Sequence, residues 1–301
     1  MAPTITPLDA TFGATITDID LAHLDQPAWQ RVEDAFHEYA VLIFPGQNLT
    51  DEAQVAFAMR FGEIELLRGD PEAKAVAISN QKPDGSVLQP EEHRYQALRG
   101  NEGWHTDSSY MPLAAKASML AALVVPSAGG ETAWADMRAA YDALDSDQKE
   151  RIEGLSAHHS LYQSQAEIGH IVETGTAYGY HNKGAPLRPL VKTHPVTGRK
   201  SLFIGRHAYQ IPGLDDGEAK ALLDDLLNFA CQPPRTYTHG WQPGDLIIWD
   251  NRCVLHAARP YDYSETRVMR HTRVAGDPAS ELAATARDAR ASGFEPSTSN
   301  I

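Results

Sequence analysis

The chain has 301 residues, 42% of them hydrophobic and 22% charged, which is the composition of a globular protein able to bury a full core. A net charge of −14 argues against a nucleic-acid or anionic-membrane surface, and no apolar run approaches the roughly 20 residues that a bilayer requires. The two cysteines, Cys231 and Cys253, have no CxxC spacing, so we expect a cytoplasmic protein without a disulfide framework or a thiolate zinc site.

The N-terminal part of the chain alternates between β and helical patterns. Residues 14–22 alternate as a strand does, and residues 24–40 carry apolar side chains at helical spacing. Residues 40–46 form a short apolar run closed by Pro-Gly, which predicts a buried strand. Residues 49–62 begin with Thr50 as a helix N-cap and end at a glycine, so a second helix is expected there.

The rest of the chain is rich in short β-favouring runs, at 75–80, 117–126, 201–205 and 245–250. Helical patterns at 137–155 and 215–231 interrupt them. Short strands with helices outside predict an α+β fold, a double-stranded β-helix (jelly-roll) core with flanking helices. We expect residues 1–275 to form one domain and the small, polar residues 276–301 to form a loosely ordered C-terminal tail.

The stretch GWHTDSSYMP carries two metal-ligand side chains one residue apart, His105 and Asp107. On an extended strand, residues i and i+2 point to the same face, so both would reach one divalent metal. The alternative is a hydrogen-bonded histidine beside a turn or cap aspartate, because His-x-Asp is common by chance. Another candidate, His256, follows an apolar run and a turn-like Asp-Asn pair. Two histidines and one carboxylate make the facial triad of non-haem Fe(II) oxygenases, which leaves three coordination positions open where a zinc site would normally keep one.

Arg267 lies eleven residues after His256, in a β-favouring run. Three open metal positions suit a cosubstrate that chelates through two oxygens and leaves the last position for O₂. Such a cosubstrate, 2-oxoglutarate, has a distal carboxylate that needs a fixed cation, and arginine pairs with carboxylates bidentately. The alternative for Arg267 is a surface salt bridge.

Four features in order, WHTD, GGET, WDNRCVLH and an arginine eleven residues later, resemble the Fe(II)/2-oxoglutarate-dependent taurine and 2,4-dichlorophenoxyacetate dioxygenase family. The resemblance covers residues 5 to 275 and implies an enzyme that uses Fe(II), 2-oxoglutarate and O₂. The residues that it implies are the iron ligands His105, Asp107 and His256, the cosubstrate residues Thr132, Arg267 and Trp249, and the substrate-pocket residue Asn101. The alternatives are a turn residue for Thr132 and a core aromatic for Trp249.

At one position the chain departs from the taurine-type pattern, in which a second arginine follows the first by four residues. Here that position is His271. If Arg267 points into the barrel, period-two alternation sends His271 and Arg273 inward and Arg270 outward. We therefore expect Arg273, alone or with His271, to bind an anionic substrate. The alternative for His271 is a core histidine that hydrogen-bonds to backbone.

Longer blocks, among them DMRAAYDALD and PLRPLVKTHPVTGRKSLFIGRHAYQIPG, resemble the aryloxyalkanoate dioxygenases that cleave (S)-2-phenoxypropionates. This resemblance implies hydroxylation of a small anionic substrate, with ether cleavage to a phenol and pyruvate. The alternatives are the same chemistry on a sulfonate, an alkyl sulfate or a natural carboxylate, a cupin-like metal-dependent hydrolase or isomerase, and a non-catalytic ligand-binding jelly roll. A homo-oligomer is expected, without nucleic-acid or membrane partners.

The remaining histidine-bearing segments have less specific patterns. The polar segment HSLYQSQAEIGH, with His158, His159 and His170 in or beside it, is interpreted as a mobile lid over the substrate. For each histidine as a ligand of a second metal, the alternative is a solvated loop. Arg206 and His207, in a turn-rich segment, are interpreted as structural residues at a subunit contact. The polar residues 80–100 are expected to become ordered on ligand binding.

Overall fold

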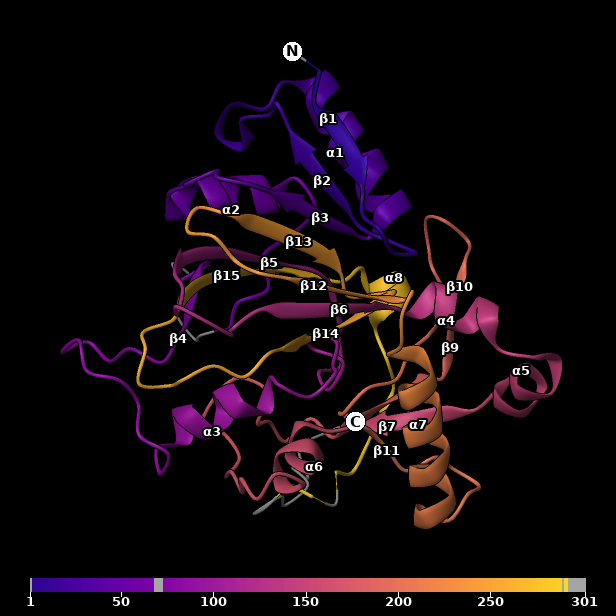
Figure 1. The fold of residues 1–301 in the computed structure, drawn as a ribbon. Coiled ribbons are helices and arrows are strands. Elements are labelled where there is room, and N and C mark those ends of the chain that lie inside the picture. The colour runs from indigo at the N-terminus through magenta and orange to yellow at the C-terminus, as the bar shows by residue number, and fades with distance from the viewer. Residues whose placement is uncertain (1, 68–72, 289, 292–301) are drawn as a thin grey trace.

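A computed structural model describes residues 2–67, 73–288 and 290–291. Its centre is a sandwich of a seven-stranded major sheet and a three-stranded minor sheet (Figure 1). The strands of the major sheet, in spatial order, are β1 (Thr4–Pro7), β2 (Ala14–Thr17), β3 (Val41–Phe44), β13 (Leu246–Asp250), β5 (Ala115–Val124), β15 (Val268–Ala275) and β4 (Val76–Ser79). Those of the minor sheet are β12 (Thr236–His239), β6 (Thr132–Asp136) and β14 (Val254–Ala258). The predicted α+β jelly-roll core with flanking helices is confirmed.

Two N-terminal helices cover the outer face of the major sheet, α1 (Gln26–Tyr39) and α2 (Asp51–Met59), as Figure 1 shows above β3 and β13. The side chain of Asp25 caps the first helix by accepting from the Ala28 amide, and Thr50 caps the second, as its sequence predicts. A short 3₁₀ helix, η1 (Leu21–His23), precedes α1. The apolar sides of these helices bury Trp29, Phe36 and Phe57 against Leu42, Phe44, Met119, Leu246 and Ile248 of the sheet.

The space between the two sheets holds a second core. Its members come from alternate positions of the major-sheet strands and from the minor sheet: Ile43, Leu120, Ile247, Trp249, Met269, Trp134 and Val254. In the ladders, Leu120 lies opposite Ile247 on one side and opposite His271 on the other. The inward face of β15 therefore borders this core, to which Met269 belongs.

The helical pattern predicted over 137–155 forms two helices rather than one, α4 (Met137–Ala143) and α5 (Ser146–Ile152). The break occurs because Leu144 has an extended backbone and Asp145 starts a new helix, accepting from the Gln148 amide in a capping box. The helix predicted at 215–231 is confirmed as α7 (Asp216–Ala230). Together with β9 (Val191–Thr193) and β10 (Lys200–Leu202), these helices enclose a third core.

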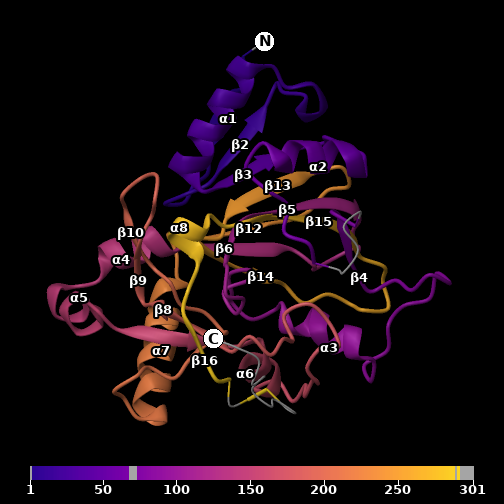
Figure 2. The ribbon, with the colours of Figure 1, turned by 180° about the vertical axis from the view of Figure 1, so that it is seen from behind.

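A four-stranded sheet completes the fold, with β11 (Ala208–Tyr209), β7 (Ser156–His159), β8 (Ala185–Pro189) and β16 (Thr285–Ala286) in spatial order. Two helices, α3 (His93–Gly100) and α6 (Leu161–Ala166), lie at the end of the molecule far from α1 (Figure 2). Within the described ranges, no helix is both long and apolar enough to cross a membrane.

The segment after residue 275, expected to be a loosely ordered tail, is part of the fold as far as residue 288. It forms α8 (Pro278–Glu281) and then β16, which pairs with β8. The Glu281 carboxylate is buried and lies 2.5 Å from Lys192 Nζ, and Asp288 accepts a hydrogen bond from Ser160. A buried ion pair and a backbone ladder hold this segment, and neither is visible in its polar composition. Residue 289 and residues 292–301 of the expected tail lie outside the described residues.

Candidate active site

His105 and Asp107 converge, although not on a continuous strand as expected. His105 forms an isolated antiparallel bridge with His256 of β14, with backbone N–H···O distances of 2.9 and 2.7 Å. The chain then turns, and Ser108 adopts a positive φ of 55°. The Asp107 carboxylate, at the start of this turn, lies beside the two histidines. One ligand atom from each of the three residues lies within 4.8 Å of the others.

Asn251, in the turn between β13 and β14, supports this ligand-bearing turn. Its carbonyl accepts a hydrogen bond from Thr106 Oγ1 at 2.7 Å, and its side-chain oxygen lies 3.3 Å from the Asp107 amide. Its side-chain nitrogen donates to Ser118 Oγ at 2.9 Å. The position of the candidate metal ligand Asp107 thus depends on Asn251, which in the sequence is recognisable only as part of a turn-like Asp-Asn pair.

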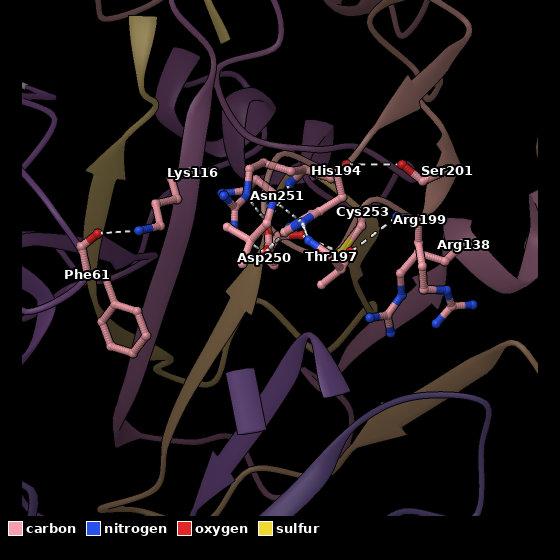
Figure 3. Close-up of polar contacts among 12 residues, drawn as sticks. Phe61, Lys116, Arg138, His194, Thr197, Arg199, Ser201, Asp250, Asn251 and Cys253 are labelled. Carbon is pink, nitrogen blue, oxygen red and sulfur yellow. Dashed lines mark hydrogen bonds and ion pairs between the residues drawn. The ribbon is translucent and has the colours of Figure 1, made fainter. Parts of the chain in front are cut away.

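The residue before it, Asp250, belongs to a buried ion-pair cluster (Figure 3). Its carboxylate accepts from Arg252 at 2.6 and 2.8 Å and from His194 Nε2 at 3.0 Å. His37 also lies close enough for these groups to be considered as a metal site. His194 has no free nitrogen for a metal, because its Nδ1 accepts from the amides of Val196 and Thr197. The cluster therefore stabilises the β13–β14 turn as an ion pair.

The protonation states of the three candidate ligands suit a divalent metal. His105 Nδ1 lies 2.7 Å from the Gly103 carbonyl oxygen, so we assign the proton to Nδ1, which leaves Nε2 with its lone pair. Burial lowers the pKa of His105 to about 4 and lowers that of His256 well below its usual value. Burial alone would raise the pKa of Asp107, but Arg273 and His256 hold it well below its ordinary value. Two neutral imidazoles and one carboxylate therefore face one point, which fits the facial triad.

All nine residues singled out from the sequence line one cavity: Asn101, His105, Asp107, Thr132, Trp249, His256, Arg267, His271 and Arg273. The lining residues that the sequence interpretation did not assign to the site are Ile78, Tyr110, Leu120, Leu161, Gln165, Arg206, His207 and Ala258. The apolar members of this second set follow no motif. Arg206 and His207 also line the cavity, and their expected place at a subunit contact stays a prediction.

Arg267 is fixed at one end of this cavity. Its Nε donates to the Gly130 carbonyl at 3.1 Å, and its backbone amide donates to the Asn80 side chain at 2.8 Å. Gly130 has a φ of +72°, and a Cβ there would lie 3.2 Å from Arg267 Cδ and Nε. The Gly-Gly pair before Thr132 therefore lets the arginine side chain pass. Within the described ranges, the terminal nitrogens of Arg267 have no hydrogen-bond partner.

Thr132 begins β6 beside this arginine, and its hydroxyl accepts a hydrogen bond from Trp241 Nε1 at 3.0 Å. The hydroxyl proton is thus available to an acceptor in the cavity. Trp249 is fully buried, with its Nε1 donating to Asn251 and its ring stacked against His271 at 6.5 Å. The two interpretations of Trp249, core aromatic and cavity wall, are both true of this position.

Arg273 lines the cavity but its guanidinium is already engaged. Nη2 lies 2.7 Å from Asp107 Oδ1, and Nη1 lies 2.9 Å from Ser108 Oγ. We expected the Arg273 guanidinium to be free to bind the substrate anion, and these hydrogen bonds disagree with that expectation. Arg270, on the same strand, points away from the cavity to α2, where it bonds Gln54 and Asp51. The alternation predicted along this strand is therefore present.

The segment interpreted as a lid, with a solvated loop as the alternative, forms one wall of the cavity. It forms β7 and α6, and Leu161 and Gln165 line the site. His159 is buried, with 1% of its surface exposed, and His170 Nδ1 contacts Gln165 at 3.2 Å. Ser164 Oγ lies 2.8 Å from His207 Nδ1, which is one of the contacts that join this polar segment to its surroundings. Arg206 Nη2 donates to the Ser164 carbonyl at 2.5 Å and Nη1 donates to the Gly100 carbonyl, which ties α6 to α3.

Comparison with known proteins gives a consistent picture. The family model described as "Taurine catabolism dioxygenase TauD, TfdA family" matches residues 4–273. A relative from Sphingobium herbicidovorans, an (S)-phenoxypropionate/alpha-ketoglutarate-dioxygenase, is 54% identical over 285 residues, which cover 93% of this chain and 97% of the relative. An alpha-ketoglutarate-dependent 2,4-dichlorophenoxyacetate dioxygenase from Cupriavidus pinatubonensis is 40% identical, with 92% and 99% covered.

Solved structures agree in fold. AAD-2 in complex with Mn(II) and N-oxalylglycine superposes with a TM-score of 0.84 at 40% identity, over 92% of this chain and 98% of that one. A taurine dioxygenase from Burkholderia xenovorans gives a TM-score of 0.76 at 26% identity, over 96% and 98%. N-oxalylglycine is an isostere of 2-oxoglutarate, so the first of these structures holds a metal and a cosubstrate mimic together.

Proposed function

We propose that this chain, which belongs to the taurine catabolism dioxygenase TauD, TfdA family, hydroxylates an (S)-2-aryloxypropionate. The protein is an Fe(II)/2-oxoglutarate-dependent dioxygenase. Hydroxylation of the carbon that bears the ether oxygen gives a hemiketal, which collapses to a phenol and pyruvate, while 2-oxoglutarate becomes succinate and CO₂. The substrate class is supported by two (S)-phenoxypropionate dioxygenases, 54% and 48% identical to the chain.

Three residues would hold the iron: His105 through Nε2, Asp107, and His256. When bound, Fe(II) supplies the activation of O₂ that oxidises 2-oxoglutarate and the substrate C–H bond. The two histidines are neutral and need lose no proton to bind a metal. The reaction requires no strong acid or base from the chain. Its side chains orient the reactants and exclude water.

Arg267 and Thr132 would bind the distal carboxylate of 2-oxoglutarate, and Trp249 would form the wall beside it. The guanidinium has free terminal donors, and the Trp241 contact leaves the threonine proton available. A fork-shaped cation beside a hydroxyl donor matches a carboxylate that accepts two or three hydrogen bonds. Hydrogen bonds from Arg267 to its surroundings hold it in place before the cosubstrate arrives.

The substrate carboxylate would meet Asn101, His271 and Arg206 in the remaining part of the cavity. Among the described residues, Arg206 contacts carbonyl groups rather than carboxylates, so its positive charge is not neutralised by a direct partner. Burial lowers the pKa of His271, so its imidazole is neutral at pH 7, and its Nδ1 has no partner within the described chain. The apolar residues Leu120 and Leu161 suit an aryl ring.

The observation that carries this proposal is the facial triad opening onto the same cavity as Arg267. The test is succinate release by the Fe(II)-loaded protein in air with 2-oxoglutarate and a panel of (R)- and (S)-phenoxypropionate, phenoxyacetate, taurine and an alkyl sulfate. We expect succinate and phenol with the (S)-enantiomer. Succinate with another member of the panel would keep the reaction and change the substrate. A hydrolase or isomerase would act without O₂ and without Arg267.

We also propose that the protein works in the cytoplasm, because Cys231 and Cys253 are both unpaired, as a reducing compartment favours. Self-association stays a prediction, which sedimentation of the purified chain would test.

A further inference from the structure

The two carboxylate oxygens of Asp107 have different partners. Oδ2 accepts a hydrogen bond from Ser118 Oγ at 2.6 Å and lies 3.8 Å from His256 Nε2. Oδ1 accepts from Arg273 Nη2 at 2.7 Å. The carboxylate can therefore rotate only by breaking two short hydrogen bonds. Oδ2 also lies 3.7 Å from His271 Nε2.

Arg273 is itself anchored on the side remote from Asp107. Its Nη1 donates to Ser108 Oγ, its Nε lies 3.9 Å from Glu65 Oε2, and its guanidinium carbon lies 5.7 Å from the centre of the Tyr178 ring. The anchor groups bond one another as well. Glu65 accepts hydrogen bonds from Ser108 at 2.9 Å and from the Tyr178 hydroxyl. This buried network connects the ligand-bearing turn to the loop after α2 and to the loop after α6.

These contacts commit the two terminal nitrogens of Arg273 to the ligand-bearing turn. Nη1 and Nη2 each donate one hydrogen bond to a fixed acceptor, and Nε, which has no hydrogen-bond partner within the described residues, lies 3.9 Å from Glu65 Oε2. A substrate carboxylate bound bidentately by both terminal nitrogens would compete with Asp107 and Ser108 for them. The guanidinium fork instead spans Asp107 and its neighbour Ser108, a geometry that a lysine cannot reproduce.

We propose that Arg273 is a positioning residue for the metal-ligand carboxylate of Asp107, and that it sets metal affinity rather than substrate affinity. The proposal rests on the proposed function, since it assumes that Asp107 binds the metal. Outer groups that bond a metal ligand typically change metal affinity 10- to 100-fold when they are removed. A purely electrostatic role predicts the opposite sign, because removing a cation next to Asp107 would make a divalent metal bind more tightly.

The chain offers a matched control on the same strand. Arg270 is as buried as Arg273, with 7% of its surface exposed in each case, and it forms a 2.6 Å ion pair with Asp51. Its side chain, however, faces α2 rather than the cavity. The variants R273Q and R270Q thus remove equally buried charges from β15, and only R273Q touches the Asp107 carboxylate.

The experiment is calorimetric titration of the full-length apoprotein with Mn(II), without substrate. We expect the dissociation constant to rise about 10- to 100-fold in R273Q and to change less than twofold in R270Q. R273K keeps a charge and most of the volume, and we expect an intermediate value, because an ammonium can reach Oδ1 without spanning both acceptors. Circular dichroism confirms folding, and R273K provides the test if R273Q does not fold.

Unchanged or tighter Mn(II) binding in R273Q would overturn the positioning role. A rise in substrate KM alone, with the Mn(II) dissociation constant unchanged, would instead return Arg273 to the role of substrate clamp. Equal weakening of Mn(II) binding in R273Q and R270Q would also overturn the positioning role, because the effect would then come from the loss of a positive charge in β15. Failure of the unsubstituted protein to bind Mn(II) would overturn the proposed function together with this inference.

Discussion

Arg267 is the residue on which the cosubstrate assignment depends. Its Nε is used by the Gly130 carbonyl, so only its terminal nitrogens remain for a ligand carboxylate. In Arg267→Lys, a single ammonium cannot form the bidentate pair. We expect the dissociation constant of 2-oxoglutarate to rise roughly 10- to 100-fold, equivalent to about 1.5–3 kcal/mol. The measurement is titration of the Mn(II)-loaded protein with 2-oxoglutarate, and an unchanged constant would contradict the assignment.

Gly130 is expected to be as important for that arginine as a direct contact. In Gly130→Ala, the new Cβ crowds Arg267 at 3.2 Å on a backbone with a φ of +72°. Gly154→Ala is the matched control, because its φ is +76° and nothing lies within 4 Å of its Cβ position. Both variants should lose about 1 kcal/mol of unfolding free energy from left-handed strain. Only Gly130→Ala should weaken 2-oxoglutarate binding, and equal binding in both variants would show that the close packing is unimportant.

At the scale of elements, the β13–β14 turn carries both structure and chemistry. The Asp250 carboxylate compensates the charge of the buried Arg252 guanidinium. The next residue, Asn251, supports the turn that bears Asp107. Asp250→Asn removes the charge that pairs with Arg252, and we expect it to lower the unfolding free energy by about 3–5 kcal/mol. Urea denaturation measures the change.

The control for that change is Asp224→Asn in α7. Asp224 also makes a 2.6 Å ion pair, with Lys220, but both side chains are more than half exposed. We expect its denaturation midpoint to stay the same, because solvent screens an exposed pair. Similar midpoints for both variants would mean that the buried turn contributes no more than a surface contact.

The sequence predicts some elements of the site and misses others for identifiable reasons. His105, Asp107, His256 and Arg267 stand in or at a fixed spacing from short motifs whose order resembles the family, so the sequence indicates them. The partners that hold them come from distant elements. Ser118 reaches Asp107 because β5 pairs with β13 and β15, and a single sequence carries no signal of that register.

The interpretation of Arg273 shows the same limit. Alternation along β15 correctly sends Arg273 to the cavity side, but its partner Asp107 is 166 positions away. Likewise, the turn-rich segment around Arg206 carries no signal that this residue lines the cavity. Local pattern determines which face a side chain occupies, and only tertiary structure determines what it meets there.

At the scale of the whole molecule, buried histidines make stability depend on pH. Burial lowers the pKa of His105 to about 4 and lowers those of His159, His207 and His256 well below the usual value. Below about pH 6.5 the unfolded chain binds protons that the folded chain does not. The unfolding free energy of the apoprotein should therefore fall as pH falls from 6.5 toward 4, by up to about 1.4 kcal/mol per pH unit for each such histidine.

His159 tests this dependence without touching the site. Neither of its ring nitrogens has a hydrogen-bond partner within the described residues, and it packs against Phe203. His159→Phe should reduce the proton uptake on unfolding by about one between pH 4 and 6.5. The unsubstituted protein gives the reference slope. The measurement is the unfolding free energy from urea denaturation at several pH values. If this free energy depended on pH equally steeply in His159→Phe and in the unsubstituted protein, buried His159 would not contribute to the pH dependence.

We expect one cavity to couple 2-oxoglutarate oxidation to cleavage of an (S)-2-aryloxypropionate. The most direct measurement is the ratio of succinate to phenol formed by the Fe(II)-loaded protein in air with (S)-2-phenoxypropionate and limiting 2-oxoglutarate. We predict one phenol for each succinate, and neither product without O₂. Succinate without phenol would contradict the substrate assignment. The absence of succinate with every compound of the panel, together with no visible charge-transfer band from Fe(II) and 2-oxoglutarate under nitrogen, would contradict the dioxygenase reaction itself.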